Sequence, residues 1–207
     1  PPKPLAGYKT HFEGHGEFCV SASVDSSPSF YPSYVFDQNR SSIFYWDPLS
    51  GGARYSTSPP GNYLKSNRLA AETQLGEYLV LKLPYKIKLE HFTIQRQLGG
   101  WWLPREIYYY AKSEDEDTWE QIYYHGSIFG SYSSSGNSTD GSDAPIRRDV
   151  NSNKFYRYFA LVITKGNGGG GVSLADWRLF GYPEQLPPKQ SVLHDGQLTL
   201  TKSLNVP

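Results

Sequence analysis

The chain has little cysteine, no methionine and no excess of charge of either sign. Its single cysteine, Cys19, excludes an internal disulfide and any zinc site built from several cysteines. The charges balance, with 20 Lys and Arg against 20 Asp and Glu. A neutral chain has no overall field that would steer it onto a phosphate backbone, so we expect no nucleic-acid partner.

Long hydrophobic runs are also missing. The longest apolar stretches, such as residues 158–163, are far shorter than the ~20 residues that a membrane-spanning helix needs. No charged start followed by an apolar segment marks a signal peptide. Because the chain also starts with Pro-Pro-Lys-Pro and lacks Met, we expect it to be a piece of a longer protein.

Sequence motifs of catalysis are absent as well, since neither Gly-x-Ser-x-Gly nor a Walker phosphate-binding loop occurs. His11 and His15 are four residues apart, but Glu13 stands one place too late for the His-Glu-x-x-His zinc motif. Cys19 lies in an apolar stretch, which favours a small buried side chain over a nucleophile. The acidic run 114–117 is typical of a solvated turn. We therefore expect no enzyme activity in this chain.

Turn formers and aromatic residues are abundant instead. The 207 residues include 20 Gly, 15 Pro and 17 Tyr, a composition that favours an all-β sandwich or barrel. At roughly 100–200 residues per domain, the length fits one domain with appendages. We expect an irregular lead-in over residues 1–17, with room for a short strand, then a β-sandwich over 18–182. Residues 183–207 form a predicted linker and the start of a further element.

The strand pattern is clearest in the middle of the chain. The alternating run 77–83 predicts a strand that Pro84 ends. The apolar residues over 87–97 change phase once, which predicts a β-bulge near Glu90 and His91. Further strands are predicted over residues 18–24, 106–111, 120–124, 153–164 and 172–180.

Five segments follow one another in an order that is typical of a known family. They are a Ser-rich opening strand with an Asp/Asn turn and a later Trp, a central strand pair, a strand with a Trp-bearing hairpin, an Arg-Tyr strand, and a closing strand that ends in Gly. In this sequence they are residues 21–39 with Trp46, 76–87, 105–119, 155–163 and 173–181. Together they resemble the discoidin family, also called the F5/8 type C domain, and its carbohydrate-binding relatives.

The resemblance implies an antiparallel jelly-roll β-sandwich of about eight strands, in which rigid sheets hold binding loops at one end. It also implies a structural calcium ion, as in many carbohydrate-binding members of the family. The matching ligand positions are Asp37, Asn39, Ser42 and Asp176, whose oxygens suit calcium. The alternative is that Asp37 caps its turn and Asp176 pairs with a nearby Arg.

Sugar binding is predicted for the loops at one end. Sugar C–H groups stack on aromatic rings, and sugar hydroxyls need planar polar partners. The loop 96–102 holds two adjacent tryptophans that cannot both face the core, and the loop 47–63 is expected at the same end. The alternative is that one tryptophan plugs the end of the sandwich and the other covers a neighbouring loop. The candidate carbohydrate-binding residues are Arg54, Tyr55, Asn62, Arg96, Trp101 and Trp102.

We therefore expect a non-catalytic glycan-binding or adhesion module, a lectin displayed outside the cell or on a virion surface. Its partners would be glycans or glycoproteins. A second hypothesis is a structural module of a viral capsid or fibre that contacts other surface proteins. The segment 194–207 resembles linkers in surface proteins of large DNA viruses of algae, and tyrosine is enriched in protein interfaces. A third hypothesis is an attachment domain of a larger glycoside-active enzyme.

Overall fold

The computed structural model describes residues 5, 7–24, 31–37, 53–58, 60–96, 102–129, 144–168 and 170–184. These residues form nine strands, whose pairings are all antiparallel, and one 3-10 helix, η1 (Pro32–Phe36). The all-β prediction is therefore confirmed. The strands are β1 (Lys9–Phe12), β2 (Gly16–Ala22), β3 (Gly61–Asn62), β4 (Glu77–Gln95), β5 (Pro104–Lys112), β6 (Glu120–His125), β7 (Ile146–Asp149), β8 (Tyr156–Gly166) and β9 (Asp176–Pro183).

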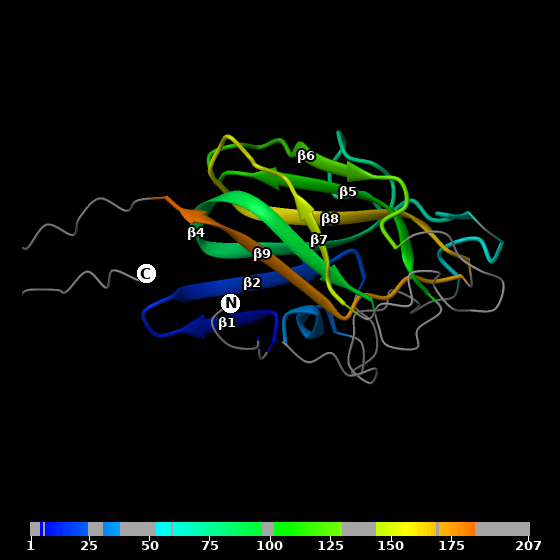
Figure 1. Ribbon diagram of the computed structural model, residues 1–207, viewed down its shortest axis with the longest axis horizontal. Coiled ribbons are helices and arrows are strands. Elements are labelled where there is room, and N and C mark those ends of the chain that lie inside the picture. The colour runs from blue at the N-terminus through cyan, green and yellow to red at the C-terminus, as the bar shows by residue number, and fades with distance from the viewer. Residues whose placement is uncertain are drawn as a thin grey trace, which may run out of the picture.

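The long strand β4 belongs to both layers of the sandwich. Its first part pairs with β8 from Glu77 to Lys82 and with β2 from Leu79 to Lys82. This part belongs to the larger layer, whose strand order is β1-β2-β4-β8-β5-β6. Its second part pairs with β9 and, from His91 to Ile94, with β7. Figure 1 shows this second part running with β7 and β9 across the front of the larger layer.

The path of β4 corrects one expectation and confirms another. Pro84 does not end the strand, which continues to Gln95. The pairing of β4 with β8 shifts register between Lys82 and Ile87, so the missing N–H of Pro84 falls where the ladder is already interrupted. The predicted bulge is confirmed, because the pairing with β9 shifts register between Leu89 and His91.

Aromatic side chains fill the space between the two layers. Tyr109 on β5 stacks on Phe92 of β4, with ring centroids 4.6 Å apart, and meets Trp177 of β9 edge-on at 5.6 Å. Trp177 Nε1 donates a hydrogen bond of 3.1 Å to the Tyr109 hydroxyl, so the buried indole N–H has its acceptor. The inward-facing Leu79, Leu81 and other alternate residues of β4 complete the core.

The first strand lies within the predicted lead-in. β1 pairs with β2, and the rings of Phe12 and Phe18 pack edge-on at 5.7 Å. The hairpin therefore extends the larger layer beyond the boundary predicted at residue 17. Of the part of the chain that the structure describes, no helix is long and apolar enough to cross a membrane. Residues 194–207 lie outside the described residues.

Candidate functional site

Backbone hydrogen bonds join several segments at one end of the sandwich. We call it the loop end: residues 53–58, 60–62, 95–96, 102–103, 166–168 and 170–175. The amides of Arg54 and Tyr55 both donate to Gly170 O, at 2.9 and 3.0 Å. The amide of Ser173 donates to Trp102 O at 2.6 Å, which ties the tryptophan loop to the same segment. The described parts of the two predicted loops therefore meet at one end.

Two close backbone approaches at the loop end require glycine. β3 pairs with the end of β8, Gly61 opposite Gly166. A Cβ atom on Gly61 would lie 3.0 Å from Gly166 O and 3.0 Å from Gly168 N, tighter than ordinary contact. Gly170, which accepts from Arg54 and Tyr55, has a φ of 88°, a conformation that residues with a Cβ rarely adopt. These glycines let the loops pack directly on one another.

A fully buried carboxylate, that of Glu77 at the start of β4, anchors the loops to the sheet. Arg54 Nη1 donates to Glu77 Oε1 at 3.1 Å, and the Tyr63 hydroxyl donates to the same oxygen at 2.6 Å. Asn67 Nδ2 lies 3.3 Å from both carboxylate oxygens, and the Ser23 hydroxyl donates to Oε2. A buried charge is tolerated only when it is paired and hydrogen-bonded, and Glu77 is both.

Two predicted contact residues belong to this anchor instead. Tyr55 is fully buried, so its ring cannot stack on a sugar, and the prediction for Tyr55 is wrong. Its hydroxyl donates to Ile163 O at 2.8 Å and accepts from the Glu77 amide at 3.4 Å. Burial, followed by the Glu77 carboxylate, holds the pKa of Tyr55 well above its usual value. Arg54 is committed to Glu77 by its ion pair, so it positions the loop.

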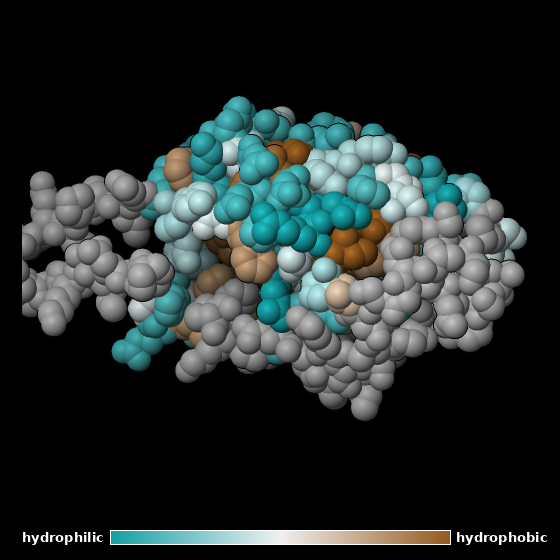
Figure 2. Space-filling model, viewed as in Figure 1, coloured by the Kyte–Doolittle hydropathy of each residue, from teal (hydrophilic) through white to brown (hydrophobic). Residues whose placement is uncertain are grey.

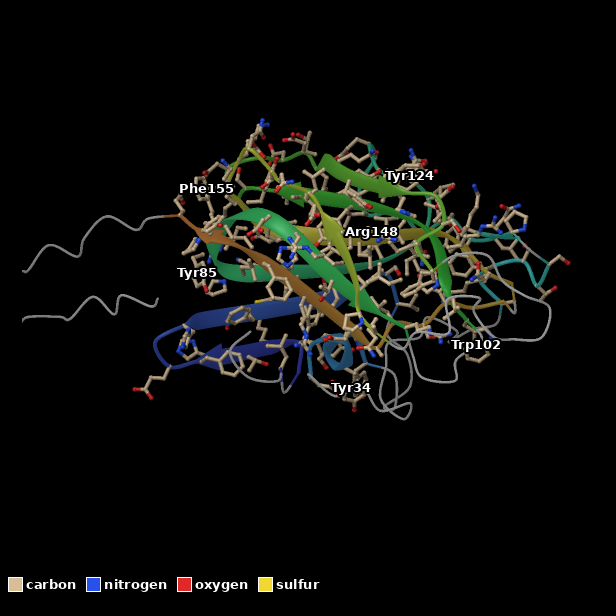
Figure 3. All side chains as sticks on the ribbon, in the orientation of Figure 1. Tyr34, Tyr85, Trp102, Tyr124, Arg148 and Phe155 are labelled. Carbon is tan, nitrogen blue, oxygen red and sulfur yellow. The ribbon has the colours of Figure 1, made fainter. Side chains whose placement is uncertain are left out.

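The other predicted contact residues keep access to solvent or lie outside the described residues. Asn62 is exposed on β3, and Arg96 is half-buried directly after β4. Trp102 is half-buried too, and Figure 3 shows it at the right-hand end of the molecule. Trp101 lies outside the described residues.

The loop end also holds an amide that sequence reasoning missed. The Asn167 side chain is 2% exposed, yet neither its Nδ2 nor its Oδ1 has a hydrogen-bond partner within the described residues. Its backbone amide donates to Leu103 O at 3.0 Å, which places it beside the tryptophan loop. Leaving a buried polar group unpaired costs about 1–3 kcal/mol, so such a group points to a bound water or ligand.

The calcium site depends on residues that are only partly described. Asp176 is buried, and its Oδ2 accepts from Arg178 Nε at 2.7 Å, as in the alternative interpretation of this residue. Asp37 follows Phe36, whose ring packs 5.4 Å from that of Trp177, the neighbour of Asp176. Asn39 and Ser42 lie outside the described residues. The described side chains contain no cluster of three His, Cys, Asp or Glu that could hold a metal, so calcium stays a prediction.

A hollow lies on the side of the sandwich, between β2 and β9. It has a volume of about 450 Å³, and Figure 2 shows brown, apolar side chains on its floor. Its described lining includes Phe18, Leu81 and Trp177, and its charged groups are the Asp176–Arg178 pair. Most of its described lining is apolar, and the polar groups beyond that pair are His15 and Tyr85.

Glu77 and Asn167 had only weak signals in the sequence. Glu77 is an acidic residue that begins an apolar strand, and such a residue is normally paired. Asn167 opens the run of four glycines that follows β8, where a polar loop residue is unremarkable. The partners of Glu77 lie 10 to 54 residues away, at distances that no periodic pattern marks.

Three solved structures show what this fold is similar to. A family 32 carbohydrate-binding module of Clostridium perfringens, CpGH89CBM32-5, was solved in complex with GalNAc-β-1,3-galactose; it is 14% identical, with 79% of this chain and 95% of that chain covered and a TM-score of 0.54. The family 32 module of NanJ from C. perfringens was solved in complex with galactose. It is 12% identical, the match covers 78% of this chain and 92% of that chain, and the TM-score is 0.51. The C-terminal domain of a chitobiase from Bacteroides fragilis is 16% identical. The match covers 85% of this chain and 99% of that chain, and the TM-score is 0.55.

These likenesses confirm the predicted β-sandwich fold. At such low identity they show the fold alone. Comparison of the sequence with protein-family models gives no match, and comparison with curated proteins gives none either.

Proposed function

We propose that this chain is a non-catalytic glycan-binding module whose loop end holds the sugar. The similar structures support this proposal, because two of them are carbohydrate-binding modules solved with bound sugars. In such a module the sheets supply a rigid frame, and the loops that they hold make the contacts.

The observation that carries the proposal is the meeting of Trp102 and Asn167 at the loop end. The carbonyl of Trp102 accepts from the Ser173 amide, and that of its neighbour Leu103 accepts from the Asn167 amide. An indole ring offers a face for sugar C–H groups, and an unpaired amide offers one donor and one acceptor for sugar hydroxyls. Arg96 and the exposed Asn62 add further polar groups at the same end.

Galactose-containing glycans are the first ligands to test, because two similar structures hold galactose or a galactose disaccharide. The chain would be applied to a glycan array that includes galactose and GalNAc-β-1,3-galactose. We expect binding that Trp102→Ala and Trp101→Ala each weaken by more than about tenfold, since truncating a central aromatic anchor costs about 2 kcal/mol.

Two controls make that experiment decisive. Phe155→Ala removes a ring at the opposite end of the molecule (Figure 3) and should leave binding unchanged. A folded wild-type chain that binds no glycan would reject the proposal and favour the hypothesis of a capsid or fibre module that contacts protein.

We also propose a structural calcium ion and display outside the cell or on a virion surface. For calcium, Asp37 and Asp176 would supply carboxylate oxygens together with Asn39 and Ser42. A ligand that binds only the folded state stabilises it, so a chelator should lower Tm. An unchanged Tm, with no bound ion in native mass spectrometry, would reject the calcium site.

A further inference from the structure

A polar and aromatic cluster lies on the outer face of the larger layer, next to the loop end. It contains Glu106, Tyr108, Tyr124, Thr164 and Lys165, and we call it the outer cluster. The residues come from three neighbouring strands, β5, β6 and β8. The outer cluster therefore stands on paired strands rather than on a loop, which fixes the positions of its side chains.

The carboxylate of Glu106 is the centre of the outer cluster. Thr164 Oγ1 donates to Glu106 Oε1 at 2.7 Å, and Lys165 Nζ donates to Oε2 at 2.8 Å. The hydroxyl of Tyr124 also donates to Oε2, at 3.2 Å. Partial burial alone would raise the pKa of Glu106, but the bonds from Lys165 and Thr164 outweigh it and hold that pKa below its usual range. Glu106 is thus a fixed acceptor.

Aromatic rings flank this acceptor. Tyr124 is 47% exposed, although its hydroxyl is held by Glu106. Its ring centroid lies 4.7 Å from that of Tyr108, which in turn stacks on Tyr110 at 6.4 Å. The contact with Tyr108 and the bond to Glu106 therefore fix the orientation of the Tyr124 ring, while 47% of the residue stays exposed.

The charges of the outer cluster select the kind of ligand. Glu106 and Lys165 neutralise each other, so the outer cluster presents hydrogen-bonding groups without a net charge. A neutral ligand rich in hydroxyls, with an apolar face for the ring, fits this combination. Those are the properties of a sugar ring.

The outer cluster is continuous with the loop end. Asn62 on β3 stands opposite Lys165 on β8 in the strand register, so the loop end and the outer cluster adjoin there. Glu106 on β5 follows Trp102 by four residues in the chain, which span at most about 14 Å. One oligosaccharide can therefore reach both places.

Resting on the proposed function of the loop end, we propose that the outer cluster is a second subsite, which binds a further sugar unit of a longer glycan. The ring of Tyr124 stacks on that unit, while Glu106 accepts from its hydroxyls and Lys165 donates to them. The module then prefers oligosaccharides to monosaccharides.

The test compares glycans of different length with matched variants. Galacto-, gluco- and manno-oligosaccharide ladders of one to six units are titrated against the wild type, Tyr124→Ala, Tyr124→Phe and Phe155→Ala. In the wild type, affinity should rise with the length of the oligosaccharide. Tyr124→Ala should weaken the binding of the longer members roughly three- to tenfold and leave that of the monosaccharides unchanged. Tyr124→Phe keeps the ring and should retain most of that affinity, and Phe155→Ala should change nothing.

The outcomes separate the second subsite from the first. If Tyr124→Ala leaves the long ladder members unchanged, or weakens the monosaccharide equally, the second subsite is rejected while glycan binding stands. If the wild type binds no ladder member, both proposals are rejected. Because Tyr124 is on the surface, its variants should fold, and an unchanged Tm confirms that.

Discussion

The loop end and the opposite end of the sandwich use charge in different ways. At the loop end, Glu77 is fully buried and receives hydrogen bonds from four different side chains. At the opposite end, which Phe155 marks in Figure 3, Lys154 pairs with Glu120 at 2.7 Å, and the two side chains are 54% and 42% exposed. The same kind of ion pair thus stands in two very different surroundings.

The difference shows which charges hold the candidate site. A buried carboxylate has lost its water, so every donor around it is needed and the residues that carry those donors are fixed. An exposed pair competes with water and salt, so it fixes little. We infer that the geometry of the loop end depends on Glu77, whereas the pairs at the opposite end act mainly as a solvated surface.

Removing the buried carboxylate should have the largest effect. Glu77→Ala leaves the Arg54 guanidinium and the Tyr63 hydroxyl without their acceptor, and breaking a buried ion pair in this way costs about 3–5 kcal/mol. That corresponds to a fall in Tm of roughly 6–20 °C for a chain of this size. Thermal unfolding would measure it, with Glu77→Gln as the milder control. A Tm close to that of the wild type would show that Glu77 does not anchor the loops.

Replacing the unpaired amide should change stability in the opposite direction. Asn167→Leu has a similar volume and removes the unsatisfied Nδ2 and Oδ1, so it should stabilise the fold by about 1–3 kcal/mol. If the amide binds a sugar hydroxyl, the same variant should lose glycan affinity. Exposed Asn153→Leu is the control and should change neither quantity. A destabilised Asn167→Leu would contradict the assignment.

Alkaline pH should destabilise the fold, in part through two tyrosines that hold the loop end. Burial and the bond to Glu77 raise the pKa of Tyr63, and burial raises that of Tyr55. In the unfolded chain these tyrosines ionise near a pKa of about 10, so their contribution is present below that pH and is lost as the pH rises further. Tm measured from pH 8 to 11 should fall above pH ~10. Tyr63→Phe should make that fall shallower, and an unaltered slope would contradict the assignment.

The exposed pair at the opposite end should have the smallest effect. Lys154→Ala removes the partner of Glu120, but both groups can be hydrated instead. We expect a Tm indistinguishable from that of the wild type at physiological salt. A clear destabilisation would mean that the two ends do not differ in the way described above.

The strands were predictable because alternation is a local signal. The run from Tyr78 to Leu83 alternates as a half-buried strand does, and the change of phase near His91 marked the bulge. The passage of β4 through Pro84 was not predictable, because the sequence does not show that the ladder is interrupted there. That interruption follows from the bend of β4 between the two layers.

The candidate site was predictable only in outline. Adjacent tryptophans after two glycines marked a loop, and Trp102 does lie at the loop end. Tyr55 was misassigned, because a tyrosine in a Pro- and Gly-rich loop gives no sign of the buried Ile163 carbonyl that holds its hydroxyl. Contacts between residues far apart in the sequence bury Tyr55. Contacts of the same kind surround Glu77 and Asn167.

The location of bound sugar tests the central claim most directly. Backbone amide signals of the isotope-labelled chain would be followed by NMR during titration with the tightest glycan from the array. We predict that the largest changes in chemical shift fall on amides of the loop end, within residues 53–58, 61–62, 102–103, 166–168 and 170–175. The amide signals of Phe155 and its neighbours should stay unchanged. Shifts centred on the opposite end, or on the hollow between β2 and β9, would contradict the account.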